Sequence, residues 1–96
     1  MTYELQFKKT ALKEWKKLGD TIRTQFKKKL TERLESPHVP SAKLAGGHNL
    51  YKIKLRQSGC RLVYQVEDQI VTVTVIAIGK RERGDVYSDI QRRLDE

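Results

Sequence analysis

The sequence predicts an α+β fold of order β-α-α-β-β-β-α, with an N-terminal helical hairpin on one face of a small antiparallel sheet and a short C-terminal helix. Three observations predict this fold. Apolar residues alternate near the start of the chain, they recur at helical spacing between residues 10 and 34, and three β-rich segments follow a loop that contains both prolines. Because the helices occupy one face, we expect the other face of the sheet to lack intrachain cover.

The chain length and composition indicate a single soluble domain. With 96 residues, 38% of them hydrophobic and 33% charged, the chain is the size of one globular unit, which we expect to span residues 1–96. Cys60 is the only cysteine, which excludes an intrachain disulfide and suits a reducing cytoplasm. The start lacks the apolar segment of a signal peptide, and no run approaches the roughly 20 apolar residues of a membrane span. We therefore expect a cytoplasmic protein.

The first half of the chain predicts a strand and two helices. A strand is expected where three apolar residues alternate with polar ones, at Tyr3, Leu5 and Phe7. Thr10 is the predicted cap of a first helix that Gly19 ends, and Asp20 the predicted cap of a second. Each helix carries an apolar stripe, formed in the first by Ala11, Leu12, Trp15 and Leu18 and in the second by Ile22, Phe26, Leu30 and Leu34.

The second half predicts three strands and a last helix. Residues 36–49 contain both prolines and a Gly-Gly pair, so they should form a loop. Strands are expected at about 50–56, 60–67 and 70–79, the last rich in Val, Ile and Thr. The tail from Asp85 carries Val86, Ile90 and Leu94 at helical spacing, which predicts a short amphipathic helix.

Strand alternation places several cations on the uncovered face of the sheet. A hairpin centred between Gln57 and Ser58 sets Tyr51 against Tyr64 and Lys54 against Arg61, with Lys52 on the same face as these two cations. A second turn, centred between Asp68 and Gln69, is expected to place Val71, Val73, Val75 and Ala77 on the core side. Thr72, Thr74 and Ile76 would then share the face of the cations.

The pairing of Lys54 with Arg61 opposes folding rather than helping it. Two like charges about 5 Å apart repel by about 3 kcal/mol at an effective dielectric of 20, although measured cross-strand effects are nearer 0.2–1 kcal/mol. The alternative is that long cationic stems simply cover an exposed sheet and protect it from aggregation. Three cations that converge on one face favour an anionic ligand instead.

The overall charge also points to a polyanion. Twenty Lys and Arg against twelve Asp and Glu give a formal charge of +8, and the pI is near 9.8. Further cations follow the last strand at Lys80, Arg81 and Arg83, near the mouth of the same face. Tyr87 begins the final helix, where it either joins the apolar stripe or places its hydroxyl at the rim of the cationic face.

The sequence lacks the motifs of metal, nucleotide-cofactor and covalent catalysis, so we expect neither a metal nor a cofactor. His38 and His48 could act as an acid and base pair, but solvated loop histidines are commoner. A cluster of Lys and Arg with one Tyr suits attack of an RNA 2'-hydroxyl on its own phosphate. The cations would stabilise the charge of the transition state, and Tyr87 could serve as the base because they lower its pKa.

These residues resemble the RelE toxins of bacterial toxin-antitoxin systems, which are ribosome-dependent mRNA interferases. The resemblance covers nearly the whole chain and includes ALKEWKKLG at 11–19, YKIKLRQSGCRLVYQV at 51–66 and IGKRERGDVYS at 78–88. It implies cleavage of mRNA in the ribosomal A site, with a 2',3'-cyclic phosphate as product. It also implies that the catalytic residues are Lys52, Lys54, Arg61, Arg81 and Tyr87, with Tyr87 as base and Arg81 as proton donor to the leaving oxygen.

The resemblance further implies partners and shows two departures. Lys27, Lys28 and Lys29 are similar to the family's basic helix surface, a candidate contact for ribosomal RNA, although a solvated helix face is an equally simple interpretation. A RelB-like antitoxin is implied, with an acidic segment that covers the basic surface in a hetero-oligomer. Cys60 replaces a common aromatic residue, and Ala45 stands where relatives can have a basic one.

Two other functions remain open. A ParE-like toxin shares the fold but inhibits DNA gyrase and lacks this catalytic set. A basic RNA-binding module without chemistry would explain the charge equally well, but it gives no reason for Tyr87 beside Arg81.

Overall fold

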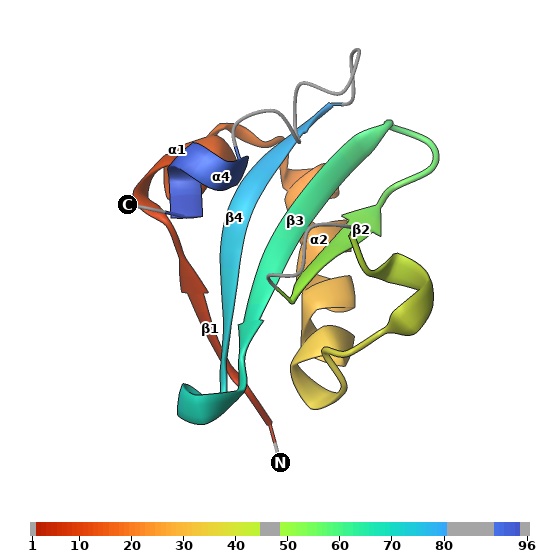
Figure 1. The fold of residues 1–96 in the computed structure, drawn as a ribbon. Coiled ribbons are helices and arrows are strands. Elements are labelled where there is room, and N and C mark those ends of the chain that lie inside the picture. Colours follow the sequence, from red (N-terminus) through yellow and green to blue (C-terminus); the bar gives the residue numbers. More distant parts are fainter. Residues whose placement is uncertain (1, 45–48, 81–89, 95–96) are drawn as a thin grey trace.

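The computed structural model describes residues 2–44, 49–80 and 90–94 of the chain. Its helices and strands (Figure 1) are β1 Glu4–Phe7, α1 Lys9–Lys17, α2 Asp20–Glu35, β2 Leu50–Lys54, β3 Cys60–Glu67, β4 Thr72–Lys80 and α4 Ile90–Leu94. Two short 3-10 helices lie at Pro40–Ala42 and Asp68–Ile70. No helix among the described residues is long and apolar enough to cross a membrane.

The four strands form one mixed sheet in the order β1-β4-β3-β2. β2 and β3 are antiparallel, as are β3 and β4, whereas β1 runs parallel to β4 with Leu5 opposite Val73. The predicted α+β class is therefore confirmed, but the prediction of a purely antiparallel sheet is wrong for β1. The helical hairpin carries the chain away from β1, so the strand that pairs with β1 is β4, the last strand in the sequence.

Sheet pairing, rather than the predicted caps, sets the start of α1. The N–H of Lys8 still donates to the carbonyl of Val75 at 2.9 Å, while the carbonyl of Lys8 accepts from the N–H of Leu12 at 2.9 Å. Lys8 is therefore the N-cap, and Thr10 lies inside the helix. Asp20 is likewise the first residue of α2 rather than its cap, and its carboxylate accepts a hydrogen bond from Arg23 at 2.7 Å.

Helices α1 and α2 pack on one face of the sheet and enclose the main core. The predicted helical stripes are confirmed except at Leu12: Ala11, Phe26 and Leu30 are buried against the inward residues of β2, β3 and β4. Leu12 is 38% exposed and takes no part in the core, so its place in the predicted stripe was wrong. Trp15, Leu18, Ile22 and Leu34 are partly buried around the same core. The main core includes Ile53, Leu62, Tyr64, Val66, Val73 and Val75.

The predicted pairing of β2 with β3 is confirmed. Tyr51 lies opposite Tyr64, Ile53 opposite Leu62 and Lys54 opposite Arg61. The turn between these strands contains Gly59 at φ +74°, a conformation that glycine adopts without steric cost. β3 has the predicted bounds, 60–67. β2 begins at Leu50 as predicted but ends at Lys54, two residues earlier than expected.

The predicted pairing of β3 with β4 is wrong in register. The connection contains a 3-10 helix followed by Val71 in the left-handed region at φ 50°, so Glu67 pairs with Thr72. A further register shift between Val63 and Tyr64 sets Val63 opposite Ala77. Val73 and Val75 face the main core as predicted. Val71 instead belongs to the connection. Ala77 lies on the other face of the sheet, and Ile78 occupies the core position that was predicted for it.

The second face of the sheet is covered in part by α4, which corrects the prediction of an open face. A second apolar cluster contains Leu50, Val63, Ile76, Ala77 and Ile90, with Leu44 and Leu94 packed against it. Figure 1 shows α4 beside β4, in front of α1, and α2 behind the sheet. The short C-terminal helix therefore has its own apolar contact with the sheet, as expected from its spacing of Ile90 and Leu94.

Candidate functional site

The candidate site begins at the end of the second face, next to the β2–β3 turn. Leu50 and Val63 carry the apolar cluster at one end of these strands, and the cations Lys54 and Arg61 occupy the end near the turn. Lys52 lies between the two regions, opposite Val63. The apolar contact with α4 and the cationic end therefore divide one sheet face between them.

Within this cationic end the three predicted catalytic residues have different exposures. Lys54 is exposed, Lys52 is half-buried, and Arg61 is only 7% exposed. Arg61 lies opposite Lys54 on one side and Gly79 of β4 on the other. Since arginine stays protonated at pH values below about 12, this arrangement holds a permanent positive charge within the sheet.

The predicted cations beyond β4 are placed only in part. Lys80 is exposed at the end of β4, opposite Cys60. Because Cys60 and Arg61 are neighbours in β3 and face opposite sides of the sheet, Lys80 is out of register with the face of Arg61. Arg81, Arg83 and Tyr87 lie outside the described residues, as do His48 and Ala45. Cys60 is a free, buried cysteine that packs in the main core, so the departure at this position is accommodated on the helical side of the sheet.

Arg33 of α2 supports β2 from behind and was missed by the sequence analysis. Its Nη1 atom donates to the hydroxyl of Tyr64 at 2.9 Å and to the carbonyl of Lys52 at 3.3 Å. The Tyr64 hydroxyl in turn donates to the carbonyl of Pro37 at 2.8 Å. Burial raises the pKa of Tyr64, and the nearby guanidinium opposes this shift. A signal was present, because Arg33 follows Leu30 by three residues and so lies on the apolar stripe of α2.

A second unpredicted contact fixes α4 at the edge of β4. β1 pairs with β4 only as far as Val75, which leaves the next backbone groups of that edge without a strand partner. The Glu14 carboxylate accepts from the N–H of Ile78 at 3.1 Å, and Arg93 donates to the carbonyl of Ile76 at 3.3 Å. The two side chains also form an ion pair, with N–O distances of 2.5 and 3.1 Å.

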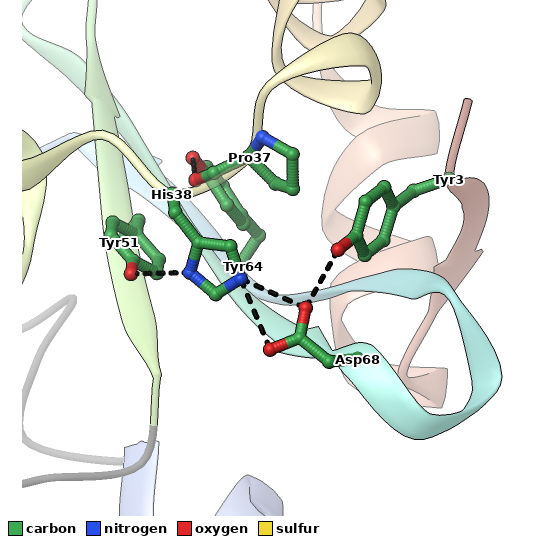
Figure 2. A network of polar contacts seen from close by, with 6 residues as sticks. All are labelled: Tyr3, Pro37, His38, Tyr51, Tyr64 and Asp68. Atoms are coloured by element: carbon green, nitrogen blue, oxygen red, sulfur yellow. Dashed lines mark hydrogen bonds and ion pairs between the residues drawn. The ribbon is translucent and has the colours of Figure 1, made fainter. Parts of the chain in front are cut away.

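His38 belongs to a polar network at the opposite end of the sheet (Figure 2). Its Nδ1 atom lies 2.8 Å from the Tyr51 hydroxyl, and its Nε2 atom lies 2.8 and 3.1 Å from the two oxygens of Asp68. The hydroxyl of Tyr3 donates to Asp68 at 2.7 Å, which lowers the pKa of Asp68 together with the contact from His38 and raises the pKa of Tyr3. Through its two ring nitrogens His38 links β2 to the β3–β4 connection.

The three consecutive lysines of α2 lie on its exposed surface. Lys27, Lys28 and Lys29 are all exposed, and Lys28 and Lys29 line a groove together with Lys54 and Arg56 of the β2–β3 hairpin. In the part of the chain that the structure describes, no three His, Cys, Asp or Glu residues are grouped so that they could hold a metal ion. Fold and site together define a small basic α+β protein with cations gathered at one end of a sheet face.

Comparison with known proteins identifies the family. A family model described as "ParE toxin of type II toxin-antitoxin system, parDE" matches residues 5–84. The mRNA interferase toxin RelE of Escherichia coli K12 is 58% identical over 94 residues, which cover 98% of this chain and 99% of that protein. The mRNA interferase RelE of Shigella flexneri has the same identity and coverage. The chain belongs to the ParE toxin family of type II toxin-antitoxin systems.

Solved structures agree with the assignment. The E. coli toxin RelE in its free state, as a mutant with two arginines replaced by alanine, is 56% identical with a TM-score of 0.90, over 98% of this chain and 99% of that one. The mutant in complex with a peptide of the antitoxin RelB is 58% identical with a TM-score of 0.82, over 93% of this chain and 94% of that one. The predicted resemblance to RelE toxins is confirmed.

Proposed function

We propose that this protein is the toxin of a type II toxin-antitoxin system and an endoribonuclease that cleaves mRNA in the ribosomal A site, which inhibits translation. The observation that carries the proposal is the 58% identity to RelE mRNA interferases over 98% of the chain. The direct pairing of Lys54 with Arg61, which costs folding energy, agrees with it. An RNA phosphate that docks on this face would neutralise both charges.

In the proposed reaction the 2'-oxygen attacks the adjacent phosphorus while the bond from phosphorus to the 5'-oxygen breaks. The products are a 2',3'-cyclic phosphate and a free 5'-hydroxyl. Tyr87 takes the proton from the 2'-hydroxyl, and Arg81 is assigned to the leaving oxygen, as a charge stabiliser and as the donor of its proton. Because arginine is a weak acid, positioning of the substrate must supply much of the rate.

The remaining cations bind the phosphate and its transition state. Lys52, Lys54 and Arg61 stabilise the extra negative charge on the phosphate oxygens, where one well-placed donor is worth about 2.7–4 kcal/mol. Lys80, the last residue of β4, and Arg83 are assigned to RNA binding, and Lys27, Lys28 and Lys29 add charge on α2 for contacts with RNA. We assign these roles to the protein as a single domain that works in the cytoplasm with no cofactor.

The natural inhibitor is expected to be a RelB-like antitoxin. The intact E. coli RelBE toxin-antitoxin complex has been solved, and one of its chains is 60% identical to this one. A basic toxin with a formal charge of +8 suits an acidic partner segment. We therefore propose a toxin-antitoxin hetero-oligomer in which this segment covers the cationic surface and prevents ribosome binding.

Programmed ribosomes provide the direct test. The protein should cut mRNA in the A site, leave free RNA nearly intact, and yield cut ends with a 2',3'-cyclic phosphate, all of which primer extension and end analysis can measure. Arg81→Ala and Tyr87→Phe should abolish cleavage while the melting temperature stays nearly unchanged. A large fall in melting temperature would make these residues structural.

The match to the ParE toxin family model keeps the ParE-like alternative of the sequence analysis, a DNA gyrase inhibitor, as the second candidate. A supercoiling assay with purified gyrase separates the two activities. Intact mRNA together with inhibited supercoiling would reject the endoribonuclease. Ribosome binding with neither activity would leave only an RNA-binding module.

A further inference from the structure

A cationic groove between α2 and the β2–β3 hairpin lies next to the candidate site. It has a volume of about 470 Å³, and its walls carry Lys28 and Lys29 on one side and Lys54 and Arg56 on the other. Of the described residues that line it, Glu32 is the one acidic residue, and Gln25 and Gln57 are also polar. The groove therefore joins two segments that are far apart in the sequence into one positive surface.

The four cations are not neutralised within the part of the chain that the structure describes. Their side chains are all exposed, and none forms a hydrogen bond or ion pair with a described residue, Glu32 included. By contrast, Arg23, Arg33 and Arg93 each have a defined partner. Collecting unpaired like charges on two facing walls opposes folding, and a polyanion in the groove would offset this cost.

The lining favours a phosphodiester backbone over an acidic peptide. Leu55 is the one apolar residue in the described part of the groove lining, so an amphipathic peptide helix would find little surface there on which to bury its apolar face. Lysine, arginine and glutamine side chains all donate to phosphate oxygens. Among the described residues that line the groove, none is an aromatic on which a base could stack, so these side chains would hold the backbone without reading the bases.

Lys54 connects the groove to the candidate catalytic face. It pairs with Arg61 across the sheet and also lines the groove, so a strand whose scissile phosphate lies at these cations has a continuous positive path toward α2. We propose that the groove binds the phosphodiester backbone of the same RNA strand that is cleaved, beyond the cut site. This inference rests on the proposed function and assigns Lys28, Lys29 and Arg56 as substrate-binding residues.

Ribosomes programmed with two messages test the proposal. One message extends past the A-site codon and the other ends at that codon, so only the first offers backbone to the groove. For the variant Lys28→Ala/Lys29→Ala, the concentration for half-maximal cleavage of the long message should rise about tenfold, and the salt dependence of log K should fall by about 1.4, or about 0.7 for each lost phosphate contact. The short message should be cleaved alike by variant and wild type.

Lys16→Ala/Lys17→Ala is the matched control, because it removes the same charge from exposed positions on α1 outside the groove. A groove variant that behaves like this control overturns the inference. An equal loss on both messages also overturns it, since ribosomal RNA would then be the ligand. If the wild type cleaves neither message, the proposed function fails. Fluorescence anisotropy with a labelled single-stranded oligoribonucleotide then tests separately whether the groove binds RNA. Equal RNA affinity of the groove variant and the control would overturn the inference that the groove binds the RNA backbone.

Discussion

The Nε2 atom of His38 lies 2.8 Å from the nearer carboxylate oxygen of Asp68, although the two residues are 30 positions apart in the sequence. Their contact ties the segment after α2 to the β3–β4 connection (Figure 2). The hydroxyl of Tyr3, near the start of the chain, donates a hydrogen bond to the same carboxylate. The network thus links three segments at the end of the sheet far from the cations.

The lowered pKa of Asp68 predicts an acid-sensitive contribution to stability. Because the pKa is lower in the folded state than its ordinary value of 3.8, the folded protein favours the charged carboxylate. This stabilisation is present above pH 3.8 and is lost as the pH falls through the folded-state pKa. Asp68→Asn should therefore lower the melting temperature at neutral pH, and the difference from wild type should shrink in more acidic buffer. A difference that stays constant from pH 7 to pH 2.5 would contradict this explanation.

Lys54 is expected to contribute to mRNA cleavage while it lowers the stability of the fold. Its like-charge pairing with Arg61 opposes folding by about 0.2–1 kcal/mol, so Lys54→Gln should leave the free energy of unfolding unchanged or raise it by that amount. The same change should slow mRNA cleavage by about 10²- to 10³-fold if Lys54 stabilises the transition state. Urea unfolding and single-turnover cleavage measure the two effects.

Lys13→Gln on α1 is a suitable control for this experiment, since Lys13 is exposed and lies outside the sheet. It should change neither quantity beyond a few tenths of a kcal/mol. Raising the salt concentration should shrink the stability gain of Lys54→Gln, because exposed charges are screened. A variant that loses stability as well as activity would show that Lys54 has a structural role.

The Tyr64 hydroxyl is expected to stabilise the connection behind β2. It donates to the carbonyl of Pro37 and accepts from Arg33, and its side chain is fully buried. Tyr64→Phe leaves both partners short of a hydrogen bond and should lower the free energy of unfolding by about 1–3 kcal/mol. Tyr3→Phe, which removes an exposed hydroxyl that water can replace, should cost less than about 1 kcal/mol in the same urea titration. Equal costs for both variants would contradict the role of burial.

The sequence predicted those features of the fold that depend on local periodicity. The stripe of Phe26 and Leu30 and the pairing of Lys54 with Arg61 follow from repeats of 3.6 and 2 residues, and both are confirmed. The parallel pairing of Leu5 with Val73 could not be predicted in this way, because it joins strands from opposite ends of the chain. The register shift between Val63 and Tyr64 is not marked by any residue type in the sequence. The face on which Ala77 lies was therefore predicted wrongly.

The candidate site shows the same division. Alternation along β2 and β3 was sufficient to gather Lys52, Lys54 and Arg61 at one surface. It could not show that α2 lies close enough to the hairpin for Lys28 and Lys29 to share a groove with Lys54, because that distance depends on how the helix packs. It also gave no sign that Arg93 would reach the edge of β4.

The ion pair of Glu14 with Arg93 is expected to hold α4 on the sheet. Both side chains also bind backbone groups of β4, and Arg93 is only 14% exposed. Glu14→Gln keeps an acceptor for the N–H of Ile78 but removes the charge that balances the guanidinium. The free energy of unfolding should fall by about 1–3 kcal/mol, and the amides of residues 90–94 should exchange with deuterium faster than those of β3.

Glu4→Gln is the matched control, because Glu4 is exposed on β1 and should change neither quantity. Arg93→Lys should give an intermediate result, since lysine keeps the charge but cannot form two parallel hydrogen bonds to one carboxylate. Faster exchange confined to residues 90–94 would mean that α4 opens as a local unit when the pair is broken. Unchanged exchange there in Glu14→Gln would show instead that the apolar contact of Ile90 and Leu94 is sufficient to hold the helix.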